Sequence, residues 1–463
     1  MRVHLIAACG VGMSALAALL REAGHSVSGS DQHAYPPAST LLRALGVTVA
    51  SGWEPRRLDG VDLVICGNAV TRDNPEAAAA RERGLRTMSF PQALEELFLE
   101  GRRPLVVAGT HGKTTSASML AFVLERCGRD PGWLIGGAPR DLPSSARLGG
   151  SPWFVVEGDE YDSAYFDKEA KFLHYRPDTL LLTAVEFDHA DIYRDVDAVK
   201  AAFRKLLALL RPGSGLVACG DFPHLVDAVS GAPVDPQLFG LEAHNTWRVT
   251  DLVDDGMTRF RIRENGREMC EVTLRVPGPI NARNALGVLL VARQVGVTWP
   301  AAVQALREFR GVSRRQEVVA EGRGVTVIDD FAHHPTAVAG TLAALRLRYP
   351  GRRLRAVFEP RSNTSRRRVF EREFADALAA ADEAVLAAVF TKPNDPIPES
   401  ERLSPETIVA EVARRGTPSR TIDGVPAIRD YLLSSARSGD VIVIMSNGSF
   451  DGLPRLVADA LGA

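Results

Sequence analysis

A lysine and two threonines follow a glycine turn in the segment GTHGKTT, at residues 109–115. The apolar run before it is typical of a β-strand, and the run after it is typical of a helix. In such a loop backbone N–H groups point at phosphate oxygens, Lys113 reaches the β- and γ-phosphates, and the Thr114 hydroxyl binds Mg²⁺. The strand and the helix disfavour the alternative, a glycine turn with a surface lysine. The general P-loop has a glycine where this chain has Val107, so this loop is a shortened form. The residues predicted to bind phosphate are Gly109, Thr110, His111, Gly112, Lys113, Thr114 and Thr115.

Two acidic segments follow apolar runs. VVEGDEYD, at residues 155–162, carries four acids, of which Glu157 comes first after the apolar run. A carboxylate at a strand end beside a P-loop suits a second Mg²⁺ ligand, so Glu157 is the predicted ligand; a solvated acidic loop is the alternative. VEFDHADIY, at residues 185–193, is expected to be a strand that ends in Asp188 and His189. A histidine there can ligate a metal or hold a carboxylate, and a structural histidine is an equally good interpretation.

Polar side chains also mark two later segments. In PGPINARNALG, Asn281 and Asn284 are three residues apart and share one face of a helix start. They can read an adenine edge, whereas Asn281 can instead simply cap the helix. VIDDFAHHPT ends a strand with two acids, and a carboxylate such as Asp330 suits a ribose hydroxyl. Its adjacent histidines lack a zinc-ligand spacing and precede a proline, which disfavours zinc.

A second glycine turn lies near the N-terminus. Residues 2–31 predict a strand, a Gly10-x-Gly12 turn, a helix and a second strand that ends at Asp31. An acid about 20 residues after the turn is typical of a dinucleotide-binding βαβ unit, although any nucleotide diphosphate would fit. A tight turn that binds nothing is the alternative.

Length and composition limit the possible classes. The 463 residues suffice for about two to four domains. The formal net charge of -2 gives no support for a nucleic-acid or anionic-membrane partner. The five cysteines have neither metal nor disulfide spacing, which indicates reduced thiols. No signal-peptide pattern and no apolar span of about 20 residues is visible, so the cytoplasm is the expected location.

Strand and helix patterns alternate along the chain and predict three α/β domains, each on a mostly parallel sheet. The first, at residues 1–101, is Rossmann-like and is followed by a polar linker. The second, at residues 102–310, is of the P-loop ATPase type and contains an antiparallel excursion near residues 245–276. The third, at residues 311–463, is again Rossmann-like, with strands in VTVIDDF, RLRAVFEP, EAVLAAVF and DVIVIMSNG.

The order of these motifs resembles that of the Mur ligases, ATP-dependent enzymes that build the peptide of bacterial cell-wall precursors. The resemblance spans the whole chain and rests on AGTHGKTT, the Glu157 segment, EFDHAD, the paired asparagines, GVSRRQE and DDFAHHPT. It implies that ATP converts a substrate carboxylate to an acyl phosphate, which an amine then attacks. It also implies Mg²⁺ as a cofactor and an N-terminal domain that binds a UDP-sugar.

The resemblance assigns roles residue by residue. Lys113 and Arg315 would contact phosphate as catalytic residues, and Thr114, Glu157 and His189 would hold the metal, the last two also with catalytic roles. Asn281 and Asn284 would lie on the adenine side, and Asp330 would bind the ribose. The residues that match the family's UDP-sugar site are Gly10, Val11, Gly12, Met13, Ser14, Asp31, Asn68 and Thr71.

Two positions depart from the family pattern. Ile280 stands where the family often has a histidine, which affects the details of the adenine pocket. Phe203 stands nearest to the position where other branches carry a carbamylated lysine, so that modification is not expected here.

Three further segments resemble one branch of the family, which joins UDP-N-acetylmuramate to the tripeptide L-alanyl-γ-D-glutamyl-meso-diaminopimelate in peptidoglycan recycling. They are EYDSAYFDKEAKFLHYRP, EPRSNT and MSNGSFDGL, at residues 160–177, 359–364 and 445–453. A guanidinium such as that of Arg361 suits a peptide carboxylate. That both third-domain loops are only turns is the alternative. The predicted peptide-binding residues are Arg361, Ser362, Asn363, Ser446 and Asn447.

Other functions fit less of the chain. The L-alanine-adding branch shares the core motifs and is the second candidate. A folyl-polyglutamate-type ligase lacks this N-terminal domain, and a nicotinamide dehydrogenase leaves the P-loop unexplained. A non-enzymatic nucleotide-binding switch needs neither the UDP-sugar domain nor the strand-end acids of the third domain. The expected partners are therefore ATP, UDP-N-acetylmuramate and the tripeptide, with no nucleic acid, membrane or obligatory protein partner.

Overall fold

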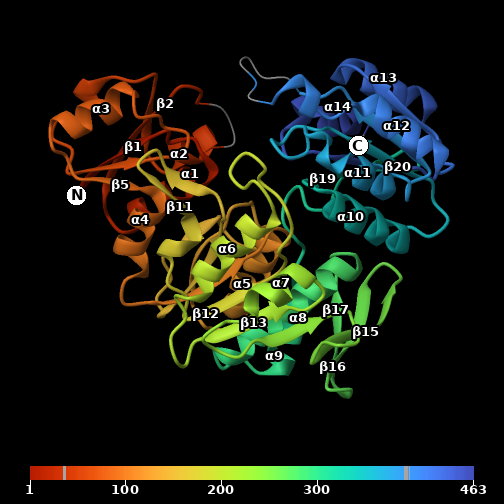
Figure 1. Ribbon diagram of the computed structural model, residues 1–463, viewed down its shortest axis with the longest axis horizontal. Coiled ribbons are helices and arrows are strands. Elements are labelled where there is room, and N and C mark those ends of the chain that lie inside the picture. Colours follow the sequence, from red (N-terminus) through yellow and green to blue (C-terminus); the bar gives the residue numbers. More distant parts are fainter. Residues whose placement is uncertain (35–37, 391–394, 396, 463) are drawn as a thin grey trace. The chain divides into compact units, whose positions relative to one another are not determined.

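The computed structural model describes residues 1–34, 38–390, 395 and 397–462 (Figure 1). The chain forms two compact units. The first comprises Met1–Glu186, Val196–Arg248 and Asn284–Leu306, and the second comprises Phe187–Asp195, Val249–Arg283 and the residues from Arg307 onward. Among the helices of the described ranges, none is long and apolar enough to cross a membrane.

The N-terminal part of the first unit is a five-stranded parallel sheet with the order β3-β2-β1-β4-β5. The strand order reverses between β1 and β4, which is where such sheets bind ligands. The glycine turn follows β1 directly, as the sequence predicted, and therefore lies at this point. The elements are β1 (Arg2–Ile6), α1 (Val11–Glu22), β2 (Ser26–Asp31), α2 (Ala38–Ala44), β3 (Thr48–Ser51), β4 (Leu63–Cys66), α3 (Pro75–Glu82), β5 (Thr87–Ser89) and α4 (Phe90–Leu94).

The second sheet of this unit has the order β15-β14-β13-β12-β6-β9-β7-β8, and β6 pairs in parallel with β12 on one side and with β9 on the other. Helix α5, which begins directly after the glycine loop, is buried along almost its whole length. The strands are β6 (Arg103–Ala108), β7 (Gly132–Leu134), β8 (Ala146–Arg147), β9 (Trp153–Gly158), β12 (Thr179–Leu182), β13 (Gly215–Cys219), β14 (Gln237–Gly240) and β15 (Trp247–Asp254). The helices are α5 (Lys113–Arg126), α6 (Val196–Leu207), α7 (Pro223–Val229), α8 (Gly278–Gln294) and α9 (Trp299–Glu308).

The predicted strand over VEFDHADIY is wrong. β12 covers only the preceding TLLL, and residues 183–193 contain no strand. After Leu182 the backbone and side-chain groups of two residues hold the glycine loop instead. The Thr183 hydroxyl donates to the carbonyls of Ala108 and His111, and the Ala184 carbonyl accepts from Thr110 N–H at 2.9 Å. Strand β12 therefore ends where Thr183 and Ala184 form hydrogen bonds to the glycine loop.

The predicted antiparallel excursion is confirmed. In the second unit β16 (Thr258–Glu264) pairs antiparallel with β17 (Arg267–Leu274), with one irregularity in register after Ile262. A continuous side of β16 is buried, through Thr258, Phe260 and Ile262, in the alternation expected of a half-buried strand.

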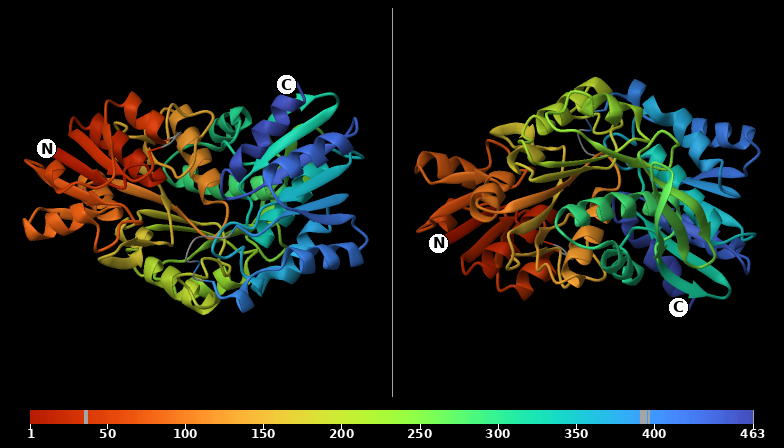
Figure 2. Two further views of the ribbon diagram at one scale, coloured as in Figure 1. Left: turned by 90° about the horizontal axis from the view of Figure 1, so that it is seen from above. Right: turned by 90° about the horizontal axis from the view of Figure 1, so that it is seen from below.

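The C-terminal sheet belongs to the second unit and has the order β18-β19-β23-β20-β21-β22, in which only β18 is antiparallel. All four strands predicted here are present. Helices cover both faces of the sheet (Figures 1 and 2), with α10, α11 and α12 packing on one apolar cluster and α13 and α14 on the other. The strands are β18 (Glu317–Gly322), β19 (Val325–Asp330), β20 (Leu354–Phe358), β21 (Glu383–Ala387), β22 (Ser419–Ile422) and β23 (Val441–Met445). The helices are α10 (Pro335–Arg348), α11 (Glu371–Leu378), α12 (Pro405–Arg414), α13 (Val425–Ser435) and α14 (Leu453–Ala460).

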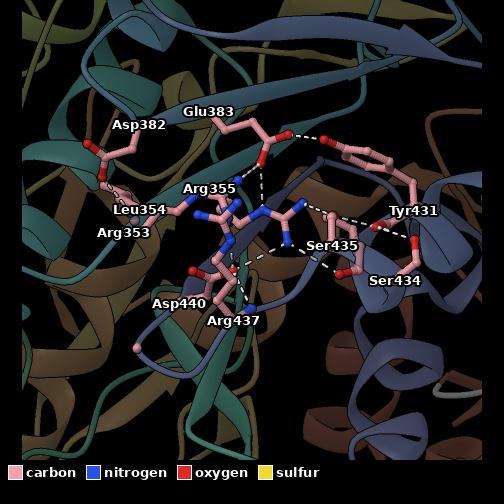
Figure 3. A network of polar contacts seen from close by, with 12 residues as sticks. Arg353, Leu354, Arg355, Asp382, Glu383, Tyr431, Ser434, Ser435, Arg437 and Asp440 are labelled. Carbon is pink, nitrogen blue, oxygen red and sulfur yellow. Dashed lines mark hydrogen bonds and ion pairs between the residues drawn. The ribbon is translucent and has the colours of Figure 1, made fainter.

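A buried ionic network joins the N-terminal ends of three of these strands (Figure 3). The guanidinium of Arg355, on β20, is fully buried and donates to Glu383 and to Ser435, each at 2.7 Å. Glu383 also accepts from Arg353 at 2.6 Å, and Asp440 lies 3.5 Å from Arg355. A buried charge is stable only when it is paired and hydrogen-bonded, as it is here. The network thus fixes the strand ends that are opposite to the loops with the predicted peptide-binding residues.

Candidate active site

The glycine loop is held in a backbone conformation that glycine adopts without strain. Gly112 has a φ of 79° and precedes α5, and a Cβ there would lie 2.8 Å from Oδ1 of Asn284. Gly109 has a φ of 138°, and a Cβ there would lie 2.8 Å from the backbone nitrogen of Ala184. The first N–H groups of α5 lack intrahelical partners by geometry, and the helix dipole adds partial positive charge, so this turn suits an anion.

The acids at and after the end of β9 have different hydrogen-bond partners. Thr114 donates its hydroxyl to Oε1 of Glu157 at 2.7 Å, and Gly136 donates its N–H to Oε2 at 2.7 Å. Lys113 donates to Glu160 at 2.7 Å. Asp159 accepts from Lys171 at 2.6 Å, so three acids of one segment have three different partners.

The register between strands explains this arrangement. Glu157 is opposite Val107 in the parallel pairing of β9 with β6, as expected for an acid that ends a strand beside the P-loop strand. Both strands therefore release their loops at the same edge of the sheet. Burial opposes the charge on Lys113, but the carboxylates of Glu160, Asp159 and Glu157 outweigh it and raise the pKa of Lys113. The lysine is consequently an ammonium group at any physiological pH.

Two oxygen ligands that would suit Mg²⁺ are thus already in contact at the glycine loop. Hydroxyl and carboxylate oxygens are the ligands that this ion prefers, and the Thr114 hydroxyl lies 2.7 Å from the Glu157 carboxylate. The residues present therefore fit the metal that the resemblance implies.

The paired asparagines are inside a helix. α8 begins at Gly278, so Asn281 lies in its first turn, and the alternative that Asn281 caps the helix is wrong. Its side-chain amide donates to the Pro277 carbonyl at 2.8 Å and to Gln316 at 3.1 Å. Asn284 packs beside Gly112 of the glycine loop. Contact of either asparagine with adenine remains a prediction.

His189 belongs to the second unit and Glu157 to the first, so the metal pair they were expected to form remains a prediction. In the second unit, Ala190 N–H donates to the Thr364 hydroxyl at 3.1 Å. Asp191 accepts from the Asn363 amide at 2.8 Å. The EPRSNT loop therefore holds the residues that directly follow His189.

The third-domain acids occupy different environments. Asp330 is buried and accepts backbone hydrogen bonds from Gln316 and Ala332, each at 2.7 Å. Burial raises its pKa, although the charge of Arg315 and these hydrogen bonds oppose the shift. Burial also raises the pKa of Asp329 to about 6, with Arg314 opposing and Asp330 adding to the shift. Ribose binding by Asp330 remains a prediction.

The guanidinium of Arg315 lies 4.4 Å from the ring centre of Phe331, within the range of a cation–π contact. This contact fixes the arginine beside the strand end of β19. Phe331 was not predicted from the sequence to belong to the site. Its position directly after two strand-end acids was a signal that could have identified it.

The two loops with predicted peptide-binding residues lie together, because β20 and β23 pair in parallel and Phe358 is opposite Met445. Glu359 joins them: it accepts from Arg361 at 3.1 Å and from the Ser446 hydroxyl. The Arg361 guanidinium also lies 4.2 Å from the ring centre of Phe390. Neither Glu359 nor Phe390 was predicted from the sequence to belong to the site. Glu359 is the first residue of the EPRSNT segment, and this position was a signal that could have identified it.

The predicted peptide residues divide into two kinds. Oδ1 of Asn447 is buried and has no hydrogen-bond partner within the described ranges. In contrast, the Asn363 side chain binds Asp191 and accepts from Arg366 at 3.1 Å, and the Ser362 hydroxyl bonds Ser365 at 2.9 Å. In this structure Asn363 therefore connects the loop to Asp191, and Ser362 supports the loop itself.

Asp31 forms a hydrogen bond to the backbone of the loop that contains the N-terminal glycine turn. Its carboxylate accepts from Cys9 N–H at 2.8 Å and from His33 N–H at 3.1 Å. The Ser14 hydroxyl donates to the Val11 carbonyl at 3.0 Å. The last two residues of the predicted UDP-sugar site, Asn68 and Thr71, are exposed on the loop after β4.

The segment EYDSAYFDKEAKFLHYRP forms a small hairpin, β10 (Asp162–Ala164) with β11 (Asp167–Ala170). Its tip reaches the N-terminal sheet, where the Tyr165 hydroxyl accepts from Arg81 at 2.9 Å. Tyr165 also packs on the apolar cluster of that sheet. No pattern in the sequence indicated this connection between the two sheets of the first unit.

Comparison with known proteins identifies three successive domains of one family along the chain. The model of the Mur ligase family catalytic domain matches residues 2–102, that of the Mur ligase middle domain matches residues 107–292, and that of the Mur ligase glutamate ligase domain matches residues 314–448.

Three relatives illustrate the similarity. The UDP-N-acetylmuramate–L-alanyl-γ-D-glutamyl-meso-2,6-diaminoheptandioate ligase of Escherichia coli (strain K12) is 41% identical over 100% of this chain and 98% of its own. A crystal structure of a murein peptide ligase from Psychrobacter arcticus is 33% identical, with a TM-score of 0.73 over 100% of this chain and 99% of its own. The UDP-N-acetylmuramate–L-alanine ligase of Symbiobacterium thermophilum is 36% identical over 99% of this chain and 94% of its own.

The chain belongs to the Mur ligase family. It is accordingly an ATP-dependent, ADP-forming ligase with the three α/β domains of that family.

We expect Gly109→Ala to weaken ADP binding at least about tenfold, because a Cβ at this position meets the backbone of Ala184, which cannot move away as a flexible side chain can. Isothermal titration calorimetry would measure the change. Gly128→Ala is the matched control, since Gly128 also has a positive φ but no atom within 4 Å of the added Cβ. Equal ADP affinity in the two variants would contradict the assigned role of the loop.

Proposed function

We propose that the protein joins UDP-N-acetylmuramate to L-alanyl-γ-D-glutamyl-meso-diaminopimelate, with cleavage of ATP, in peptidoglycan recycling. The observation that carries this proposal is the 41% identity, across essentially the full length of both chains, to a ligase whose name states this reaction. Several UDP-N-acetylmuramate–L-alanine ligases match at 33–38% identity, and this activity is the second candidate. We expect the reaction to take place in the cytoplasm.

The chemistry requires charge neutralisation more than covalent help from the protein. A carboxylate is a poor acylating agent, so ATP first converts the lactyl carboxylate of muramate to an acyl phosphate. The α-amine of the tripeptide attacks this group, and the tetrahedral intermediate expels phosphate. Fixed cations lower the energy of such phosphoryl transfers, and the residues that would supply them are Lys113 and Arg315.

Bound Mg²⁺ would supply positive charge that offsets the charge of the phosphates. Thr114 and Glu157 would hold it from the first unit, and His189 would be the third ligand. The contact between Thr114 and Glu157 supports the first two assignments. Asn281, Asn284 and Asp330 would bind the adenosine part of ATP, and the N-terminal turn from Gly10 to Ser14 would bind the UDP part of the sugar nucleotide.

The direct test measures phosphate release from ATP with UDP-N-acetylmuramate and either the tripeptide or L-alanine. We expect release with the tripeptide and none above background with L-alanine. Lys113→Ala serves as the catalytic control, because loss of one preorganised electrostatic donor costs about 3 kcal/mol of transition-state stabilisation.

Each other result selects a different function. Release that depends on L-alanine would establish the second candidate. Nucleotide binding without release in either mixture would indicate a nucleotide-binding switch.

The peptide end of the site is proposed at the ends of β20 and β23. Arg361 supplies a planar guanidinium, and Glu359 and the Phe390 ring hold it in one orientation. Asn447 presents a buried amide oxygen, without a partner in the described part of the chain, to the same loop pair. A cation suits a peptide carboxylate, and an amide oxygen suits the ammonium group of diaminopimelate. Ser446 would support this pair through Glu359.

We expect Arg361→Lys to raise the tripeptide KM roughly tenfold or more, since a charge-assisted hydrogen bond is worth about 1.5–3 kcal/mol. The KM values for ATP and UDP-N-acetylmuramate should change little. Arg367→Lys is the control, because Arg367 pairs with Glu401 at the surface. An unchanged tripeptide KM, or a rise in the ATP KM alone, would remove Arg361 from the peptide pocket.

A further inference from the structure

The acid that contacts the P-loop lysine is Glu160, a residue to which the sequence prediction gave no role. Lys113 Nζ donates to Glu160 Oε2 at 2.7 Å, whereas Glu157 is bound to Thr114 and to the backbone of Gly136. The Glu160 side chain is 1% exposed and that of Lys113 is 14% exposed, so the ion pair is almost wholly shielded from water. Removing either partner would leave an uncompensated charge in this environment.

The backbone on both sides of Glu160 is fixed by a neighbouring turn. Lys171 N–H donates to the Tyr161 carbonyl at 2.9 Å, and Phe172 N–H donates to the Asp159 carbonyl at 3.2 Å. This support holds the carboxylate in place without help from a ligand.

That turn is itself anchored in the core. Phe172 is fully buried, and its ring lies 5.2 Å from the ring of Phe203. Phe203 is the residue nearest to the position where other Mur branches carry a modified lysine. In this chain the position therefore packs behind the turn that holds Glu160.

The number of N–H donors on the lysine explains how this contact can assist phosphate binding. The ammonium group has three N–H donors on a flexible four-carbon stem. One donor is used by Glu160, which leaves two for phosphate oxygens. A stem that is already ordered loses less conformational entropy when the phosphate binds.

We infer that Glu160 is the positioning residue of the P-loop lysine: it holds the Lys113 ammonium at the glycine loop before nucleotide binds and remains bonded to it during phosphoryl transfer. Glu160 acts through Lys113 and does not itself contact the substrate. This inference rests on the proposed phosphate-binding role of Lys113.

Glu160→Gln tests the inference, because it keeps the shape of the side chain and one acceptor oxygen but removes the charge. We expect kcat to fall at least tenfold, since the lysine is held less firmly. We expect the KM for ATP and the dissociation constant for ADP to change less than kcat, since the entropic cost of ordering a looser lysine and the gain from its unneutralised charge act in opposite directions. A purely structural role would lower the thermal unfolding temperature without producing this split.

The control is Asp162→Asn, the same acid-to-amide change two residues away. Asp162 pairs with the exposed Lys168 at 2.7 Å, so both kinetic constants should keep their wild-type values.

A double-mutant cycle with Lys113→Ala separates the inference from the proposed function. If Glu160 acts through the lysine, Glu160→Gln no longer lowers the residual turnover in the Lys113→Ala background, where it removes an unpaired carboxylate that opposes phosphate binding. An undiminished effect in that background, or wild-type kcat in Glu160→Gln alone, would overturn the positioning role. Wild-type ADP affinity in Lys113→Ala would overturn the phosphate role of the lysine, and the positioning role with it.

Discussion

Parallel pairing between β6 and β9 determines which residues of the proposed nucleotide site lie together. The register sets Val107 opposite Glu157, so the glycine loop and the acidic segment leave the sheet at one edge. Neither loop is sufficient by itself: the first supplies N–H groups and an ammonium, and the second supplies the carboxylates that balance and position them. A shift of one residue in this register would turn Glu157 to the opposite face of the sheet and separate it from Thr114.

The neighbouring strand β12 completes this arrangement by ending early. Thr183 and Ala184 give their hydrogen-bonding groups to the glycine loop, and the chain then leaves the sheet toward the segment that contains His189. In the second unit that segment is held by Asn363 and Thr364, from the loop after β20. The EPRSNT loop thus has two functions in the proposed scheme: Arg361 faces the peptide, and the two residues at its end support the segment of the predicted metal ligand.

The sequence was sufficient for features that depend on local order. The βαβ pattern at the N-terminus, the loop before Lys113 and the strands of the C-terminal sheet all follow from hydrophobic period and turn residues, and the structure has each of them. Glu157 was also correctly expected at a strand end beside the P-loop strand. These features are encoded within a window of a few residues, where propensity and pattern agree.

Side-chain partners were not predictable in the same way. Nothing near Glu160 in the sequence indicates that it contacts Lys113, because the two residues are 47 positions apart along the chain and their contact depends on the register of β6 and β9. The Asn363 amide donates to Asp191, which lies 172 residues away, and no local pattern in the sequence indicates that contact. The run VEFDHADIY has the composition of a strand, but tertiary hydrogen bonds to the glycine loop override that propensity.

The central claim is that the ends of β6 and β9 form one nucleotide–metal site. Electron paramagnetic resonance of Mn²⁺, in place of Mg²⁺, measures the metal directly in the presence of ADP. The account predicts that Glu157→Gln weakens Mn²⁺ binding at least about tenfold while ADP binding without metal is retained. Mn²⁺ affinity equal to that of the wild-type protein would contradict it.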